Sequence, residues 1–200
     1  MVDRYRTLAA RHALEPPPVK NSRFLAFVAP AATEEEAAAF VAGVREEYDD
    51  ARHVCWAWRL GPGGERTRSS DDGEPSGSAG RPILLQLEGH DLTDLVAAVV
   101  RYFGGVKLGV GGLMRAYGGA AGQCLDGARV REVVVTERLV IEHPYDCSNA
   151  VQAVLAAEGL TPDSSDYGER VRLELSVPRP ELERVRTALI DRSGGRVTLA

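Results

Sequence analysis

The chain has 200 residues, with 24 Lys+Arg against 29 Asp+Glu, a formal net charge of −5 and a hydrophobic fraction of 44%. This length allows one large domain or two small ones, and the composition is that of a folded globular protein rather than a disordered chain. The negative charge excludes indiscriminate binding to polyanions, although a local basic patch remains compatible with it.

Targeting and cysteine patterns point to the cytoplasm. No run approaches the roughly 18 consecutive apolar residues of a membrane helix, and the first residues lack the apolar stretch of a signal peptide. Cys55, Cys124 and Cys147 are odd in number and have no CxxC spacing, so the sequence predicts neither a disulfide scaffold nor a structural zinc site. We expect no membrane partner, no metal and no cofactor.

The first 125 residues contain signals for both helices and strands. Thr33 and Glu36 form the capping box of an amphipathic helix. Residues 61–82 are polar or rich in Gly and Pro and are predicted to form a long loop, disordered on composition alone. Asp91 is expected to cap a helix whose buried apolar face ends at Phe103. Strands are predicted over residues 24–29, 53–60 and 83–87, and a further helix over 113–125.

The last third of the chain has a different order of predicted helices and strands. A strand, a helix, a hairpin, a second helix opened by Pro180 and a closing strand give the order βαββαβ, which is that of a ferredoxin-like α/β sandwich. We therefore predict two domains, residues 1–130 and 131–200. The predicted segments are a strand over 133–141, a helix over 147–158 and a hairpin over 162–177.

The glycine-rich segment, residues 104–112, is the most informative motif. Five of its nine residues are glycine, a helix follows it, and the stretch from Arg101 to Arg115 holds three cations and no carboxylate. Glycine exposes backbone amides, and a helix N-terminus adds unsatisfied donors, so this composition suits phosphate or carboxylate binding. An equally weighted alternative is a tight corner between two helices, in which the glycines allow close packing and bind no ligand. The candidate anion-binding residues are Arg101, Gly104, Gly105, Lys107, Gly109, Gly111, Gly112 and Arg115, with Arg81 and Lys20 as a second tier.

The acidic loop, residues 69–82, is the second motif. It holds three carboxylates within four residues, which could bind a hard cation, but the alternate spacing of a calcium loop is absent. A turn-rich loop without a metal is the favoured interpretation. Its signature residues are Asp71, Asp72, Gly73, Glu74, Pro75, Gly77 and Gly80.

A third pattern, His53-x-Cys55, places both side chains on one side of a strand. A Cys–His nucleophile is conceivable, with Asp72 as a further member of the site. Apolar neighbours favour burial instead, so an enzyme is the weaker hypothesis.

Four ordered motifs resemble the YigZ/IMPACT family. They cover about 100 residues, a far more specific match than any single motif. The motifs are residues 20–24 (KNSRF), 51–58 (ARHVCWAW), 70–82 (SDDGEPSGSAGRP) and 99–117 (VVRYFGGVKLGVGGLMRAY). The last 70 residues resemble the smaller domain of bacterial members by pattern alone.

This resemblance implies an α+β fold: an N-terminal domain like the second domain of ribosomal protein S5, followed by a ferredoxin-like domain like the last domain of elongation factor G. It also implies an ordered acidic loop and favours the glycine-rich segment as the binding site. Eukaryotic members regulate translation through an additional N-terminal domain that binds a large activator of a stress kinase, a partner that we do not carry over.

The leading functional hypothesis is a cytoplasmic, non-enzymatic binding protein associated with translation, which contacts RNA phosphate or a ribosomal partner. The alternatives are a small hydrolase using His53, Cys55 and Asp72, and a protein-interaction module using the exposed sheet of the C-terminal domain.

Overall fold

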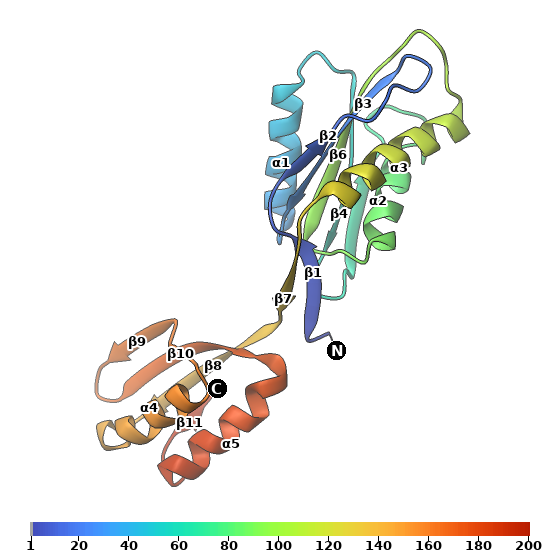
Figure 1. The fold of residues 1–200 in the computed structure, drawn as a ribbon. Helices are drawn as coiled ribbons and strands as arrows, with labels where there is room; N and C mark the ends of the chain where they lie inside the picture. Colours follow the sequence, from blue (N-terminus) through green and yellow to red (C-terminus); the bar gives the residue numbers. More distant parts are fainter. Residues whose placement is uncertain (1) are drawn as a thin grey trace. The chain divides into compact units, whose positions relative to one another are not determined.

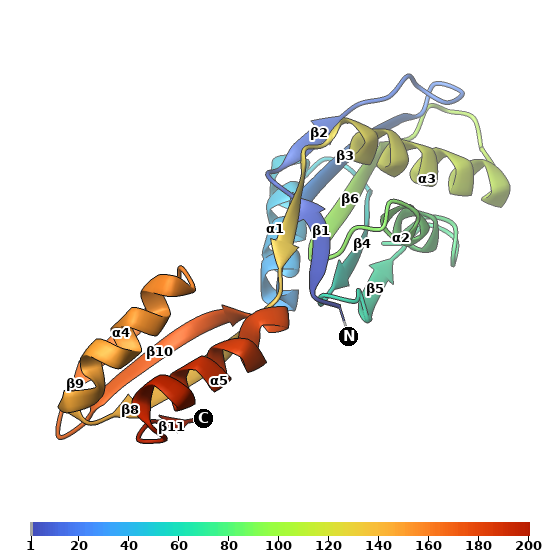
Figure 2. The same ribbon diagram turned by 60° about the horizontal axis from the view of Figure 1, so that its bottom comes forward.

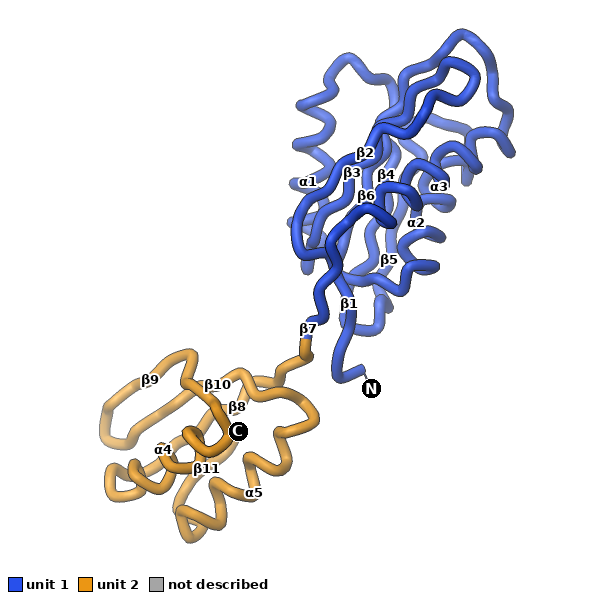
Figure 3. Tube along the Cα trace, viewed as in Figure 1, with its two compact units in different colours: residues 1–133 blue, residues 134–200 orange. Residues whose placement is uncertain are grey.

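A computed structural model describes residues 2–200. The chain divides into two compact units, residues 1–133 and 134–200 (Figure 3). Each unit has its own sheet, helices and hydrophobic core, so the two-part α+β architecture is confirmed. Across residues 2–200, no helix is long and apolar enough to cross a membrane.

The first unit is built on a five-stranded antiparallel sheet with helices on both faces (Figures 1 and 2). Helix α1 (Glu34–Glu47) lies on one face, and α2 (Gly80–Gly89) and α3 (Val110–Gly127) lie on the other. In spatial order the strands are β2 (His12–Leu14), β3 (Arg23–Pro30), β6 (Leu95–Tyr102), β4 (His53–Leu60) and β5 (Arg66–Ser70). Strand β1 (Arg4–Leu8) pairs separately with β7 (Val130–Val134).

Several local predictions are confirmed in this unit. Strand β4 has the predicted bounds, and α3 contains the predicted helix. Helix α1 begins after Thr33, whose side-chain oxygen accepts a hydrogen bond from the Glu36 amide. The Glu36 carboxylate accepts from the Ala32 amide, one residue before the position that a capping box would give.

The central strand β6 was predicted as a helix, and this prediction is wrong. Val99 packs in the core beneath α2 and α3, whereas Val96 and Val100 pack in the clusters on the α1 face. A continuous apolar run fits a helical and a strand pattern equally well. Burial on both faces, together with β-branched valines, favours the strand at the centre of a sheet.

The segment before β6 was also predicted wrongly, because residues 83–87 belong to helix α2 rather than to a strand. The helix begins at Gly80, and the Asp71 carboxylate accepts hydrogen bonds from the Ala79 and Gly80 amides. A cap supplied from eight or nine residues upstream leaves no local sequence signal. The predicted loop over residues 61–82 likewise contains β5, an exposed edge strand whose polar sequence shows no apolar alternation.

The second unit has the predicted element order βαββαβ. Its antiparallel sheet has the strand order β11 (Thr198–Leu199), β8 (Thr136–His143), β10 (Val171–Pro178) and β9 (Ser164–Tyr167). Helices α4 (Ser148–Ala157) and α5 (Leu182–Ser193) cover one face (Figure 1). The opposite face carries a ladder of ion pairs in which Arg138 and Arg172 both contact Glu174. Two short 3-10 turns, Tyr145–Cys147 and Arg179–Glu181, directly precede α4 and α5 respectively.

Candidate functional site

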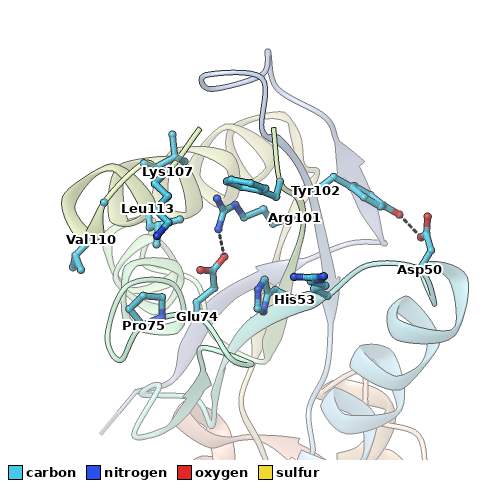
Figure 4. A pocket seen from close by; sticks show the side chains of 13 residues that line it. Asp50, His53, Glu74, Pro75, Arg101, Tyr102, Lys107, Val110 and Leu113 are labelled. Carbon is cyan, nitrogen blue, oxygen red and sulfur yellow. Dashed lines mark hydrogen bonds and ion pairs between the residues drawn. The ribbon is translucent and has the colours of Figure 1, made fainter. Parts of the chain in front are cut away.

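The acidic loop and the glycine-rich segment line one cavity in the first unit, with a volume of about 680 Å³ (Figure 4). It opens at the end of β6, so the residues that follow this strand form one wall. The lining residues are Asp50, Arg52 and His53 before and at the start of β4, Glu74 and Pro75 of the acidic loop, residues 101–103 and 107–110, and Leu113 of α3.

Two glycines give the glycine-rich segment its path. Gly104 lies against the turn at Asn21, where an added Cβ would stand 2.1 Å from the Asn21 carbonyl carbon. Gly109 precedes the first residue of α3 with φ of +71°, a backbone conformation that favours glycine. The packing interpretation of these glycines is therefore correct for Gly104, whose amide also donates to the Ser22 hydroxyl.

The remaining amides of the segment are available for a ligand. Within residues 2–200, no hydrogen-bond partner engages the backbone N–H groups of residues 105–112, which include Gly105, Gly111 and Gly112. The last three of these amides form the first turn of α3, where no acceptor exists inside the helix. The aligned peptide dipoles of an 18-residue helix add a partial positive charge at this end.

Two of the predicted cations have no acidic partner in the described part of the chain. Lys107 is exposed and lines the cavity, and Arg115 is exposed on the first turns of α3. The Arg115 guanidinium lies back toward the helix N-terminus, with Nη1 3.7 Å from where a Cβ on Gly111 would stand. Among the described residues, neither side chain forms an ion pair.

Arg101 is placed differently, because its charge is already balanced. Its Nη1 donates to Glu74 Oε1 at 2.6 Å, and the two side chains are only 8% and 4% exposed. The same Glu74 oxygen accepts a hydrogen bond from the Tyr117 hydroxyl at 2.8 Å. The Arg101 guanidinium also lies 5.8 Å from the ring centre of Phe24 and 5.6 Å from that of Phe103. Arg101 therefore holds the cavity wall rather than offering a free charge.

The carboxylates of the acidic loop are all used within the protein. Asp71 accepts from the amides of Gly77, Ala79 and Gly80; burial of its carboxyl opposes ionisation, but these bonds outweigh burial and lower its pKa. Asp72 accepts from the Val54 amide and pairs with Arg45 at 2.7 Å. The loop is ordered, and within residues 2–200 no cluster of His, Cys, Asp and Glu could hold a metal ion.

The hydrolase alternative needs a Cys–His–Asp relay, which the side chains do not form. His53 Nδ1 lies 2.7 Å from the backbone carbonyl of Asp72, while the Asp72 carboxylate points to Val54 and Arg45. The Cys55 thiol is fully buried, donates to the Asp71 carbonyl and has its pKa raised to about 12, chiefly by burial. Such a thiol stays protonated near neutral pH and is a poor nucleophile.

The two second-tier cations occupy different surroundings. Lys20 is exposed at the turn that contacts Gly104, through its neighbour Asn21. Arg81 pairs with Glu88 along α2 at 3.5 Å and does not line the cavity.

Sequence reasoning missed two aromatic contributors to this site. Phe103 was assigned to a buried helical face, but it is 59% exposed at the cavity rim. Tyr117 was not singled out, although its hydroxyl donates to the Glu74 carboxylate; burial, above all, raises the pKa of Tyr117. The position of Phe103 directly after a strand and before two glycines was the available signal.

Comparison with known proteins accounts for almost the whole chain. Residues 20–125 match the Impact N-terminal domain, and residues 141–196 match the Domain of unknown function (DUF1949). The chain is 37% identical over 183 residues to "IMPACT family member YigZ" of Escherichia coli (strain K12), covering 90% of both chains. It is 44% identical over 160 residues to "IMPACT family member in pol 5'region" of Thermus thermophilus, covering 80% of this chain and 86% of that one.

A solved structure described as a hypothetical protein superimposes on the chain with a TM-score of 0.79 and 35% identity, covering 100% of this chain and 97% of the other. "Protein IMPACT homolog" of Saccharomyces cerevisiae (strain ATCC 204508 / S288c) is 32% identical over 102 residues, 48% of this chain and 39% of that protein. The matches to both domain models and to full-length bacterial relatives place the sequence without ambiguity. This chain belongs to the IMPACT family, as a bacterial member of the YigZ type.

Proposed function

We propose that this chain is a binding protein associated with translation, and that it holds RNA phosphate at the N-terminus of α3. One observation carries the proposal: unengaged amides over residues 105–112 lie beside Lys107 and Arg115, two cations without acidic partners in residues 2–200. A helix N-terminus with free amides binds phosphate, and Arg and Lys supply bidentate and point-charge contacts.

The local charge supports an anionic ligand despite the net charge of −5. The three carboxylates of the acidic loop are bound to amides or cations of the protein. Lys107 and Arg115, near the N-terminus of α3, are exposed and have no acidic partner in residues 2–200. A short-range field is sufficient, because at physiological salt charges are screened beyond about 8 Å.

The association with translation rests on fold analogy. We propose domains over residues 1–130 and 131–200, of the ribosomal-protein-S5 second-domain type and the ferredoxin-like type respectively. Both folds occur in proteins that contact RNA on the ribosome, which makes RNA the favoured source of phosphate. Such an analogy is associational and gives no ligand by itself.

Salt-dependent binding of single-stranded RNA tests the proposal. We expect the logarithm of the association constant to fall with the logarithm of salt concentration by about 0.7 per phosphate contact. The double variant Lys107→Ala/Arg115→Ala should reduce this slope by about 1.4. Its matched control is Arg68→Ala/Arg129→Ala, which removes two exposed arginines that do not line the cavity. A slope that both double variants change equally, or that neither changes, would refute the proposal.

A further inference from the structure

We infer that the cavity takes one unstacked nucleobase, so that the ligand is single-stranded and is held as a nucleotide unit rather than as phosphate alone. This inference rests on the proposed function, because the phosphate of the same nucleotide would occupy the N-terminus of α3. The recognised chemistry is a base joined to a phosphate, which a single-stranded RNA or a free mononucleotide could supply.

Phe103 provides the stacking surface. Its side chain is 59% exposed and lines the cavity, so the face of the ring is available for stacking on a ligand. The Arg101 guanidinium lies 5.6 Å from its ring centre, and that guanidinium is fixed by the buried pair with Glu74 (Figure 4). The contact with this cation restricts the ring to fewer orientations, which lowers the entropic cost of stacking.

The proposed stacking surface and the proposed phosphate site are close together in the sequence. Phe103 directly precedes the glycine-rich segment, and Lys107 and Gly109 line the same cavity as the aromatic ring. A base on Phe103 and its own phosphate on the free amides would therefore contact neighbouring parts of one cavity wall. Single-stranded nucleic acids are bound in this manner, with aromatic stacking beside cationic phosphate contacts.

The shape and polarity of the cavity suit a base. Pro75, Leu108, Val110 and Leu113 line it with apolar groups, and a volume of about 680 Å³ lies within the range of small-molecule sites. A base within an intact duplex cannot enter, because its faces are already stacked and its edge is paired.

His53 supplies a hydrogen-bond acceptor for the edge of the base. A carbonyl oxygen only accepts, so the 2.7 Å contact from Nδ1 to the Asp72 carbonyl assigns the proton to Nδ1. In the neutral ring Nε2 then carries a lone pair, and it has no partner within residues 2–200. His53 lines the cavity, and a Cβ added at Gly73 would stand 3.3 Å from its Nδ1 and 3.4 Å from its Cε1. We expect this acceptor to bind an N–H group of the base.

Equilibrium binding of matched hexanucleotides tests the inference on the full chain. The probes are oligouridine, oligouridine methylated at N3, an abasic chain with the same number of phosphates, duplex RNA and free uridine monophosphate. We expect oligouridine to bind about 5- to 150-fold more tightly than the abasic chain, the range for stacking of one base. N3-methylation should cost about 2- to 12-fold, the equivalent of one hydrogen bond.

Two variants separate the contributions. Phe103→Ala, at an exposed position, should abolish the preference for oligouridine over the abasic chain, and Phe103→Trp should retain it. His53→Phe should bind uridine and N3-methyluridine chains equally while still preferring both over the abasic chain. A far-ultraviolet circular dichroism spectrum identical to that of the unaltered protein is the control for folding.

The outcomes distinguish this inference from the function on which it rests. If the abasic chain binds with the expected salt slope but bases add nothing, or if Phe103→Ala weakens both probes equally, the base site is refuted and the phosphate site stands. If no probe binds, both the base site and the phosphate site are refuted. Uridine monophosphate binding as tightly as the hexamer would identify a free nucleotide as the source, and weaker binding would identify an RNA chain.

Discussion

The buried pair of Glu74 and Arg101 allows a stringent test of how the cavity is held. The substitution Glu74→Gln keeps the shape of the side chain and an oxygen that can accept from Tyr117 and Arg101, but it removes the negative charge. Arg101 then remains a cation with only 8% of its side chain exposed and no anionic partner. Removing one member of a buried ion pair lowers the free energy of unfolding by about 3–5 kcal/mol. Because the introduced glutamine can keep the hydrogen bonds, we expect a loss of about 3 kcal/mol for Glu74→Gln.

Denaturant unfolding followed by tryptophan fluorescence measures this cost within the first unit. The chain has two tryptophans, Trp56 and Trp58, and both lie on β4. Their emission therefore reports on the unit that holds the cavity, even if the two units unfold separately. The free energy of unfolding follows from the midpoint and the slope of the transition.

Two further variants make the result interpretable. The double variant Glu74→Gln/Arg101→Met removes the unpaired charge, so it should recover about 2 kcal/mol relative to Glu74→Gln alone. Glu88→Gln breaks the exposed Arg81 pair at 3.5 Å and should cost less than about 1 kcal/mol. A Glu74→Gln variant no less stable than Glu88→Gln would refute the reasoning, as would a double variant that is less stable than Glu74→Gln.

Two other predictions concern the acidic loop and the buried thiol. Because hydrogen bonds lower the pKa of Asp71, its contribution is present above the ordinary pKa of about 4 and is lost as pH falls through the lowered value. Asp71→Asn should therefore lower the free energy of unfolding by about 0.5–2 kcal/mol at pH 7 and by progressively less in acid; an equal cost at pH 7 and pH 2 would contradict this. Cys55, with its pKa raised to about 12, should react with a thiol reagent at pH 8 at least about 100-fold more slowly in the folded protein than in denaturant, and rapid labelling of this residue would instead favour the hydrolase alternative.

The sequence was informative where structure is determined locally. The Thr33 cap, strand β4, helix α3 and the βαββαβ order of the second unit all follow from capping residues or periodicity. Family motifs correctly indicated that the acidic loop is ordered, against its composition. For the cap, β4, α3 and the second unit, the signal lies within the elements that it specifies.

The errors arise where a distant segment decides the structure. The amides at the start of helix α2 donate to the Asp71 side chain, which no capping pattern next to the helix contains. Strand β6 is a strand because helices cover both of its faces. The free cation expected at Arg101 is paired with Glu74, 27 residues earlier. No pattern within a short window contains these contacts, since each depends on tertiary packing.

The distribution of charge around the cavity explains how an acidic protein can present a site for an anion. Asp71 and Asp72 are held by backbone amides and Arg45, and Glu74 is held by Arg101 and Tyr117. Each negative charge of the loop is thus neutralised within a few ångströms, where Coulomb attraction is strongest.

Lys107 and Arg115 differ from these groups because they are exposed and lie next to amides that have no acceptor in residues 2–200. The acidic loop and the glycine-rich segment therefore have complementary roles: the first uses its charges to build and rigidify the cavity wall, and the second leaves its donors free. An anion entering the cavity meets donors that are already oriented, so binding requires little reorganisation of the protein.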